Sequence, residues 1–207
     1  MRRGPFLVIE GIDGCGKSTQ ASRLAAHLQG RGRPCRHLRE PGSTPLGEGL
    51  RRLLLDRETG EIDPLAEALL FLAARRELLT REVLPAQARG ETVICERFHP
   101  STICYQGAGM GVGMDKVEEL ARLTTPEVQP HLVVLLDLAA DRALARFAGT
   151  GRDRLEDRGG PYLERVRQGF LELAAREKNM VVVDADRPVA QVGRAVVQEV
   201  ERVLAGA

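Results

Sequence analysis

Nine residues near the amino terminus, GIDGCGKST, combine glycines, a lysine and two hydroxyl side chains in a spacing that suits phosphate. Gly11, Gly16, Lys17 and Ser18 match G-x-x-x-x-G-K-[ST], in which backbone N–H groups surround phosphate oxygens. Lysine then reaches the β- and γ-phosphates of a nucleoside triphosphate, and the hydroxyl ligates Mg²⁺. The predicted ATP-binding residues are Gly11, Ile12, Asp13, Gly14, Cys15, Gly16, Lys17, Ser18 and Thr19.

The meaning of this motif depends on the elements that flank it. Residues 6–10, FLVIE, form a short apolar run typical of a buried strand, and apolar residues recur at helical spacing over 20–29. The glycines therefore lie where a strand turns into a helix, and the helix amino terminus adds partial positive charge. The alternative is a glycine-rich turn with an incidental lysine.

Phosphoryl transfer to an acceptor requires further charged groups and a second pocket. Glu96 and Arg97 end the apolar run 91–96, so a carboxylate and a guanidinium emerge together. A surface ion pair is the structural alternative. Phe71 and Arg75 lie four apart on a predicted helix and share one face. Phe71 alone is typical of a core residue, but a buried arginine beside it needs a partner, and a nucleobase stacked on the ring can supply one.

Tyr105 and Gln106 offer a further aromatic wall and an amide that can read a base edge. Each is a weak signal alone. Together with Phe71 and Arg75 they favour a nucleotide acceptor over a nucleotide-dependent switch that hydrolyses ATP without one.

Four apolar runs alternate with helical stretches and predict the strands of a parallel sheet: residues 6–10, 91–96, 132–138 and 180–185, with 33–40 as a weaker fifth. The fold class is α/β, a P-loop NTPase fold with a five-stranded parallel sheet flanked by helices. Parallel strands bring their carboxyl ends to one ligand-binding edge.

Three other segments have clear local signals. Asp63 and Pro64 predict the start of a helix that extends to about Leu79. The four glycines of 107–113 predict a flexible loop. The arginine-rich segment 148–160 is either a solvated surface loop or a mobile lid that closes over ATP.

Composition limits the remaining possibilities. The 207 residues suit one domain, 1–207, and the net charge of +1 without a basic tail indicates neither a nucleic-acid nor a membrane partner. The four cysteines lack the spacing of a zinc or disulfide framework, which favours the cytoplasm. Glu10 interrupts the first apolar run too early for a signal peptide.

The chain resembles the thymidylate kinase family through four motifs in order: LREPGSTPLGEGLRRLLL at 38–55, FLAARRELL at 71–79, ERFHPSTICYQG at 96–107 and RDRLEDR at 152–158. This resemblance implies a fold of the nucleoside monophosphate kinase type and transfer of the γ-phosphoryl group from ATP to dTMP. It also implies Mg²⁺ and a homodimer. A kinase for another monophosphate or a small metabolite is the alternative.

The resemblance also assigns roles by position. Phe71 stacks on thymine, Arg75 binds its O4, and Ser101, Thr102 and Gln106 complete the base pocket. Tyr105 lies against the sugar and Asp13 near its 3′-hydroxyl. Arg51 and Arg97 bind the acceptor phosphate, with Glu40 nearby. The catalytic residues are thus Lys17, Arg97, Arg152 and Asp13, with Ser18 and Glu96 at the metal.

Two positions depart from the family pattern. Glu96 stands where an aspartate is usual, so its contact with Mg²⁺ is either direct or through water. Cys15 stands where the family has a small residue or an arginine. Without that arginine the lid must supply one, and Arg152 is the first candidate ahead of Arg146 and Arg154. The Cys15 thiol is either a small filler or an acidified, oxidation-prone group.

Overall fold

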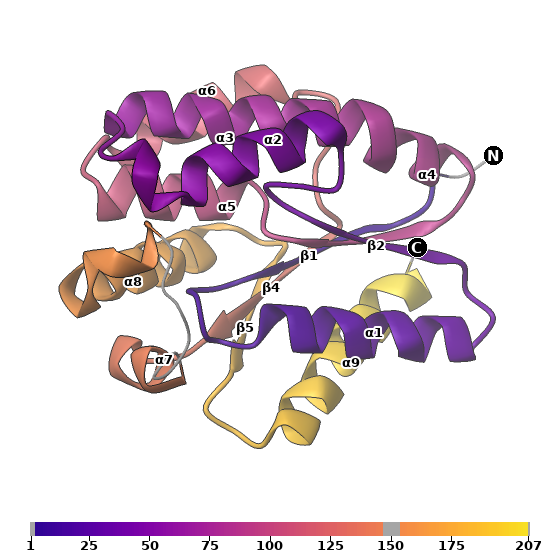
Figure 1. The fold of residues 1–207 in the computed structure, drawn as a ribbon. Coiled ribbons are helices and arrows are strands. Elements are labelled where there is room, and N and C mark those ends of the chain that lie inside the picture. Colours follow the sequence, from indigo (N-terminus) through magenta and orange to yellow (C-terminus); the bar gives the residue numbers. More distant parts are fainter. Residues whose placement is uncertain (1–2, 147–153, 207) are drawn as a thin grey trace.

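The structure, a computed structural model, describes residues 3–146 and 154–206. Its centre is one five-stranded parallel sheet in the order β2-β3-β1-β4-β5 (Figure 1). The strands are β1 Phe6–Glu10, β2 Cys35–Arg39, β3 Thr92–Glu96, β4 Leu132–Asp137 and β5 Met180–Asp184. The α/β fold and all five strands, including the weaker second one, are confirmed within one to two residues at each end.

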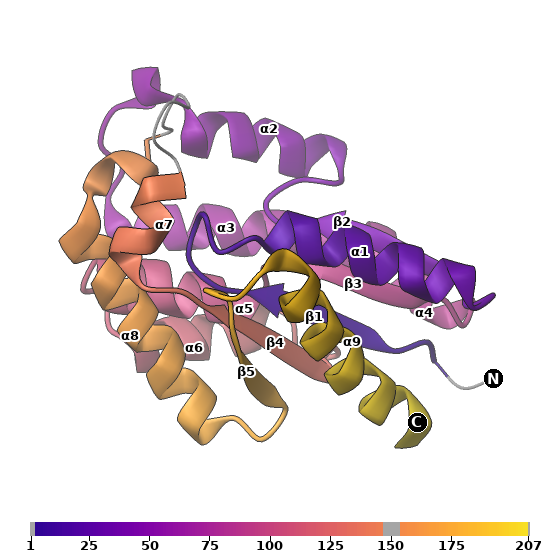
Figure 2. The same ribbon diagram turned by 90° about the horizontal axis from the view of Figure 1, so that it is seen from below.

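Helices cover both faces of this sheet. On one face, α1 (Lys17–Gly30) and α9 (Val189–Gly206) lie side by side, as the view from below shows (Figure 2). On the other lie α2, α3, α5 and α6 (Figure 1). The remaining α-helical bounds are α2 Pro45–Leu55, α3 Pro64–Leu78, α4 Leu84–Ala88, α5 His99–Thr102, α6 Met114–Thr124, α7 Ala140–Arg146 and α8 Gly160–Arg176.

The strand register explains why charged residues meet at one edge. The inner strands β1, β3 and β4 are almost wholly buried because helices cover both faces. Glu96 is opposite Ile9 of β1 and Arg39 of β2. The polar residues that end these strands therefore emerge together at the carboxyl edge, beside the loop that follows β1.

The helix predicted after Asp63 is confirmed. The Asp63 carboxylate accepts hydrogen bonds from the N–H groups of Leu65 at 2.9 Å and Ala66 at 3.1 Å, and Pro64 is the first helical residue. This capping satisfies N–H groups that have no partner within the helix. The chain then continues through a π-helical turn, Leu79–Val83, into α4.

The prediction of a flexible loop over residues 107–113 is wrong for its first half. Residues Ile103–Gly109 form a π-helix, η3, which packs against α8. A Cβ at Gly109 would lie 2.6 Å from the Tyr162 ring and 2.7 Å from Val166. This glycine permits close packing of two elements. Of the four glycines in residues 107–113, Gly111 and Gly113 have the positive φ angles of a turn, and Gly107 and Gly109 do not.

The arginine-rich segment is described from Arg154 onwards. Residues Glu156–Arg158 form a 3₁₀ helix, η4, and α8 starts at Gly160. Arg152 lies outside the described residues. None of the helices described is long and apolar enough to cross a membrane.

Candidate active site

The phosphate loop curls around the Lys17 ammonium. Gly11, Gly14 and Gly16 have φ angles of 135°, 82° and 99°, which L side chains rarely adopt. This backbone path carries the loop from β1 to the first turn of α1, where Lys17 Nζ donates to the carbonyl oxygens of Gly11 and Ile12, both at 2.9 Å. The loop therefore has the predicted strand–loop–helix setting.

Cys15 fills space beneath this loop. Its side chain is buried, and a Cβ on Gly11 would lie 2.7 Å from its sulfur and 2.5 Å from the Leu136 carbonyl oxygen. Burial raises the pKa of the Cys15 thiol, although the Lys17 charge opposes the rise. The acidified thiol is therefore contradicted, and the residue acts as a small filler.

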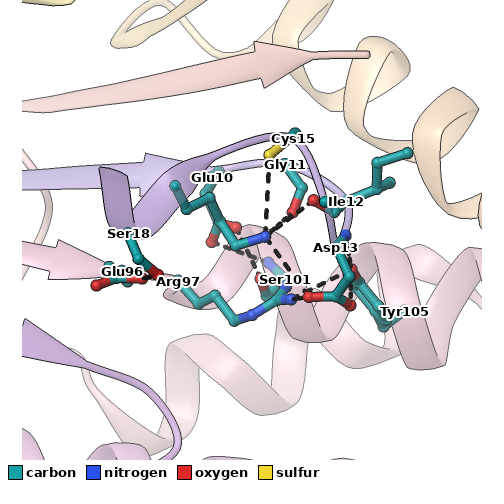
Figure 3. A network of polar contacts seen from close by, with 12 residues as sticks. Glu10, Gly11, Ile12, Asp13, Cys15, Ser18, Glu96, Arg97, Ser101 and Tyr105 are labelled. Carbon is teal, nitrogen blue, oxygen red and sulfur yellow. Dashed lines mark hydrogen bonds and ion pairs between the residues drawn. The ribbon is translucent and has the colours of Figure 1, made fainter. Parts of the chain in front are cut away.

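Glu96 faces the first turn of α1. Its carboxylate accepts a hydrogen bond from Ser18 Oγ at 2.5 Å, and its second oxygen lies 2.8 Å from His37 Nε2 on β2. Figure 3 shows Ser18 and Glu96 side by side. Burial alone would raise the pKa of Glu96, but hydrogen bonds from His37 and Ser18 hold it below its usual value. His37 gives no signal in the sequence because its partner lies 59 positions away.

Arg97 joins the phosphate loop to the acceptor side (Figure 3). Its guanidinium pairs with Asp13, donates to Ser101 Oγ at 3.1 Å, and lies over the Tyr105 ring. Tyr105 OH donates to Asp13 at 2.7 Å. Burial would raise the pKa of Asp13, but Arg97 and Lys17 together hold it well below its ordinary range.

Glu10, the last residue of β1, is a fully buried carboxylate that interacts with Arg97. It accepts hydrogen bonds from the Phe98 N–H at 2.6 Å, the Ser101 N–H at 3.1 Å and Ser101 Oγ at 2.7 Å. Burial raises its pKa, opposed by Arg97. Glu10 thus fixes the turn after β3 that carries Arg97. The sequence predicts Glu10 only as the last residue of the first strand, because its hydrogen-bond partners lie about 90 positions away.

A cavity of about 130 Å³ opens beside Arg97, between the sheet edge, α2, α3 and η3. Its walls include every residue predicted for the acceptor: Asp13, Glu40, Arg51, Phe71, Arg75, Arg97, Ser101, Thr102, Tyr105 and Gln106. Phe71 is half-buried and lines this cavity, so the interpretation of Phe71 as a core residue does not hold. Pro41, Leu55 and Leu155 complete the lining.

Arg75 is held rigidly in the wall of this cavity. Its Nε donates to Glu40 at 2.6 Å and its Nη2 donates to Thr102 Oγ1 at 2.9 Å. The guanidinium carbon Cζ lies 5.3 Å from the centroid of the Phe98 ring. Within residues 3–146 and 154–206, Nη1 is buried with no partner. Burial raises the pKa of Glu40 to about 7, with Arg75 opposing.

The arginines around the predicted lid have separate positions. Arg146, the last residue of α7, donates to the Gly14 carbonyl of the phosphate loop at 3.0 Å and to the Ala185 carbonyl at 3.1 Å. Arg154 and Arg158 instead bind the fully buried carboxylate of Glu67 on α3. Of the candidates for a lid arginine in the described chain, Arg146 is therefore the one that contacts the loop.

Comparison with known proteins identifies a family with the same features. The family profile described as thymidylate kinase matches residues 9–196. A thymidylate kinase of Symbiobacterium thermophilum is 42% identical over 200 residues, covering 96% of this chain and 94% of the relative. Those of Deinococcus radiodurans and Caldanaerobacter subterraneus are 44% and 39% identical, covering 91% and 99% of this chain and 92% and 99% of the relatives.

Proposed function

The chain belongs to the thymidylate kinase family, and from this premise we propose how its residues carry out the family's reaction. The protein is an ATP-dependent nucleoside monophosphate kinase that transfers the γ-phosphoryl group of ATP to dTMP, giving dTDP and ADP. The observation that supports our assignment of the site is the position of the cavity. Its wall and the phosphate loop share Asp13 and lie on either side of Arg97.

The cavity binds the acceptor nucleotide. Phe71 stacks on the base, and Arg75 Nη1 donates to O4, because the other polar atoms of its guanidinium are held by Glu40 and Thr102. Tyr105 packs against the sugar, with Asp13 near its 3′-hydroxyl. Arg51 and Arg97 bind the acceptor phosphate, which places its oxygen toward the phosphate loop.

Transfer then depends on alignment and charge rather than on a covalent enzyme intermediate. Lys17 binds the β,γ end of ATP through the ammonium that the loop already centres. Arg97 holds the attacking oxygen in line with the γ-phosphorus. A lid arginine, Arg152 or the loop-bound Arg146, neutralises charge on the transferred group, and closure of the lid excludes water.

Mg²⁺ fits the residues that lie at the first turn of α1. The Ser18 hydroxyl and the Glu96 carboxylate lie 2.5 Å apart, and as hard oxygen donors they are the residues that would hold the ion. The ion would offset the negative charge of the phosphates.

Two further properties belong to this proposal. We expect a homodimer, because α2 and α3 pack together and expose Leu46, Leu53 and Leu69, each at least 44% accessible. Light scattering on the purified protein should give twice the chain mass. We also expect a cytoplasmic location, which suits four cysteines that are all unpaired in the structure.

The decisive test is ADP release, coupled to an indicator reaction, across a panel of monophosphates with ATP and Mg²⁺. We expect the highest kcat/KM with dTMP and little ADP release without an acceptor. Faster turnover of CMP, UMP or AMP would identify a different monophosphate kinase. ATP hydrolysis at the same rate with and without acceptor would identify an ATPase switch.

A further inference from the structure

Glu67 is a buried acid that the phosphoryl transfer described above does not use. It lies on α3 four residues before Phe71 and eight before Arg75, so the three side chains follow one face of the helix. It is fully buried and absent from the lining of the cavity. A carboxylate in this position is costly unless every one of its contacts is satisfied.

The two carboxylate oxygens of Glu67 have different partners. Oε1 accepts from Gln106 Nε2 at 2.8 Å. Oε2 accepts from Arg154 Nη2 at 2.5 Å and Arg158 Nη2 at 3.0 Å. Two guanidinium groups therefore balance the charge on one side, and on the other the carboxylate contacts a residue that lines the acceptor cavity.

The chemistry of these groups fixes the orientation of the Gln106 amide. An ionised carboxylate only accepts hydrogen bonds, so the amide must turn its NH₂ group toward Glu67. Its carbonyl oxygen Oε1 then points away from Glu67, and no donor reaches it within residues 3–146 and 154–206. Gln106 is 1% exposed and cannot reorient into water.

Gln106 and Arg75 both line the cavity, so the unpartnered acceptor Gln106 Oε1 and the unpartnered donor Arg75 Nη1 are fixed in its wall. Glu40 Oε1, on the carboxylate that holds Arg75, is a further buried acceptor without a partner among the described residues. Thymine and uracil carry an N3–H donor beside an O4 acceptor, whereas cytosine carries an N3 acceptor beside a 4-amino donor. Cytosine would place its N3 acceptor against Gln106 Oε1 and its 4-amino donor against Arg75 Nη1. These buried polar atoms would then remain unpaired.

We propose that Glu67 is a positioning residue that sets selectivity for thymine and uracil over cytosine, by holding the Gln106 amide in one orientation from outside the cavity. This inference rests on the proposed function, because it requires the base to lie against Gln106. Glu67 itself touches neither nucleotide.

The test compares Glu67→Gln with wild type in kcat/KM for dTMP, dCMP and dUMP. The substituted amide has the same size but can both donate and accept, so Gln106 can turn either way. We expect the dTMP:dCMP ratio to fall by about tenfold or more. The dTMP:dUMP ratio should stay constant, because both bases present the same N3–H and O4 groups. A fall in both ratios indicates a loosened pocket and overturns the proposal, as does an unchanged dTMP:dCMP ratio.

Two controls separate orientation from packing and charge. Glu67→Asp keeps an acceptor-only group and should preserve the dTMP:dCMP ratio within about threefold even if turnover drops. Arg158→Gln removes a Glu67 ion pair without touching Gln106 and should leave the ratio unchanged. If Arg158→Gln lowers the ratio as much as Glu67→Gln does, the ion pair sets selectivity and the orientation argument is wrong.

A double-mutant cycle ties the effect to Gln106. Adding Glu67→Gln to Gln106→Leu should cause no further loss of selectivity, and an additive loss contradicts the proposal. If Glu67→Gln does not fold, ¹⁵N-labelled wild type provides the test. Its Gln106 NH₂ protons should exchange slowly with solvent in the absence of nucleotide, and rapid exchange overturns the assignment. Absence of dTMP turnover by wild type would instead refute the proposed function.

Discussion

The phosphate loop takes its shape from nine consecutive residues, whereas the acceptor cavity beside it is assembled from side chains between Asp13 and Leu155. In the loop, the contacts of Lys17 are with backbone five and six residues away. In the cavity, Arg75 depends on Glu40, 35 residues away, and Arg97 depends on Asp13, 84 residues away. A local motif can therefore specify the first region, but the second exists only once the sheet has formed.

The largest expected effect tests the local region. Lys17→Ala should lower kcat at least a hundredfold, because removing one preorganised charge-stabilising contact costs about 3–4 kcal/mol. Steady-state kinetics at saturating ATP and dTMP measure this. Lys116→Ala, at an exposed lysine on α6, is the matched control and should keep wild-type turnover. Near-normal kcat for Lys17→Ala would show that the loop is not the transfer site.

Phe71→Ala tests the assembled region and should have the next largest effect. Stacking contributes about 1–3 kcal/mol per base and is present in both ground and transition states. The KM for dTMP should therefore rise roughly tenfold to a hundredfold, with a small change in kcat and an unchanged KM for ATP. An effect on ATP alone would contradict the role of Phe71 as a base platform.

Glu40 provides a test through pH. Its folded-state pKa of about 7 exceeds the ordinary 4.5, so the folded protein binds more protons than the unfolded chain between those values. The contribution of Glu40 to the free energy of unfolding should fall as pH rises through this window, by at most about 1.4 kcal/mol per pH unit.

Urea titrations of wild type and Glu40→Gln from pH 4.5 to 7.5 measure this effect. The free energy of unfolding of wild type should fall relative to that of Glu40→Gln as pH rises, because glutamine cannot titrate. A constant difference would show that Arg75 keeps Glu40 ionised throughout.

Glu96→Asp should produce the smallest effect, at the point where the two regions meet. Shortening the side chain by one methylene moves the carboxylate away from Ser18 and His37. We expect the Mg²⁺ concentration for half-maximal rate to rise a few-fold. An unchanged Mg²⁺ dependence would favour contact through water, whereas loss of activity would show that the site is adapted to glutamate.

Much of the architecture could be predicted because it is local. The strands, the Asp63 cap and the phosphate loop each depend on residues within about ten positions, and the predicted acceptor residues do converge on one cavity. Gly109 was misinterpreted because glycine marks both flexible loops and close packing, and only the position of Tyr162 distinguishes them. Glu67 gave no signal, since a glutamate on a helix is ordinarily a surface residue.

The backbone of Arg97 has a φ angle of +71°, a left-handed conformation that is unfavourable for any residue with a Cβ by roughly 1–2 kcal/mol. Glycine would adopt this geometry without penalty, so Arg97→Gly would relax the bend after β3 while leaving Asp13 and Tyr105 without their cation. The fold thus keeps a strained backbone at residue 97, where the side chain must be a guanidinium. Relief of the strain would not make Arg97→Gly more stable, because removing one partner of a largely buried ion pair costs about 3–5 kcal/mol and outweighs it. Stability and turnover therefore select the same residue at this position.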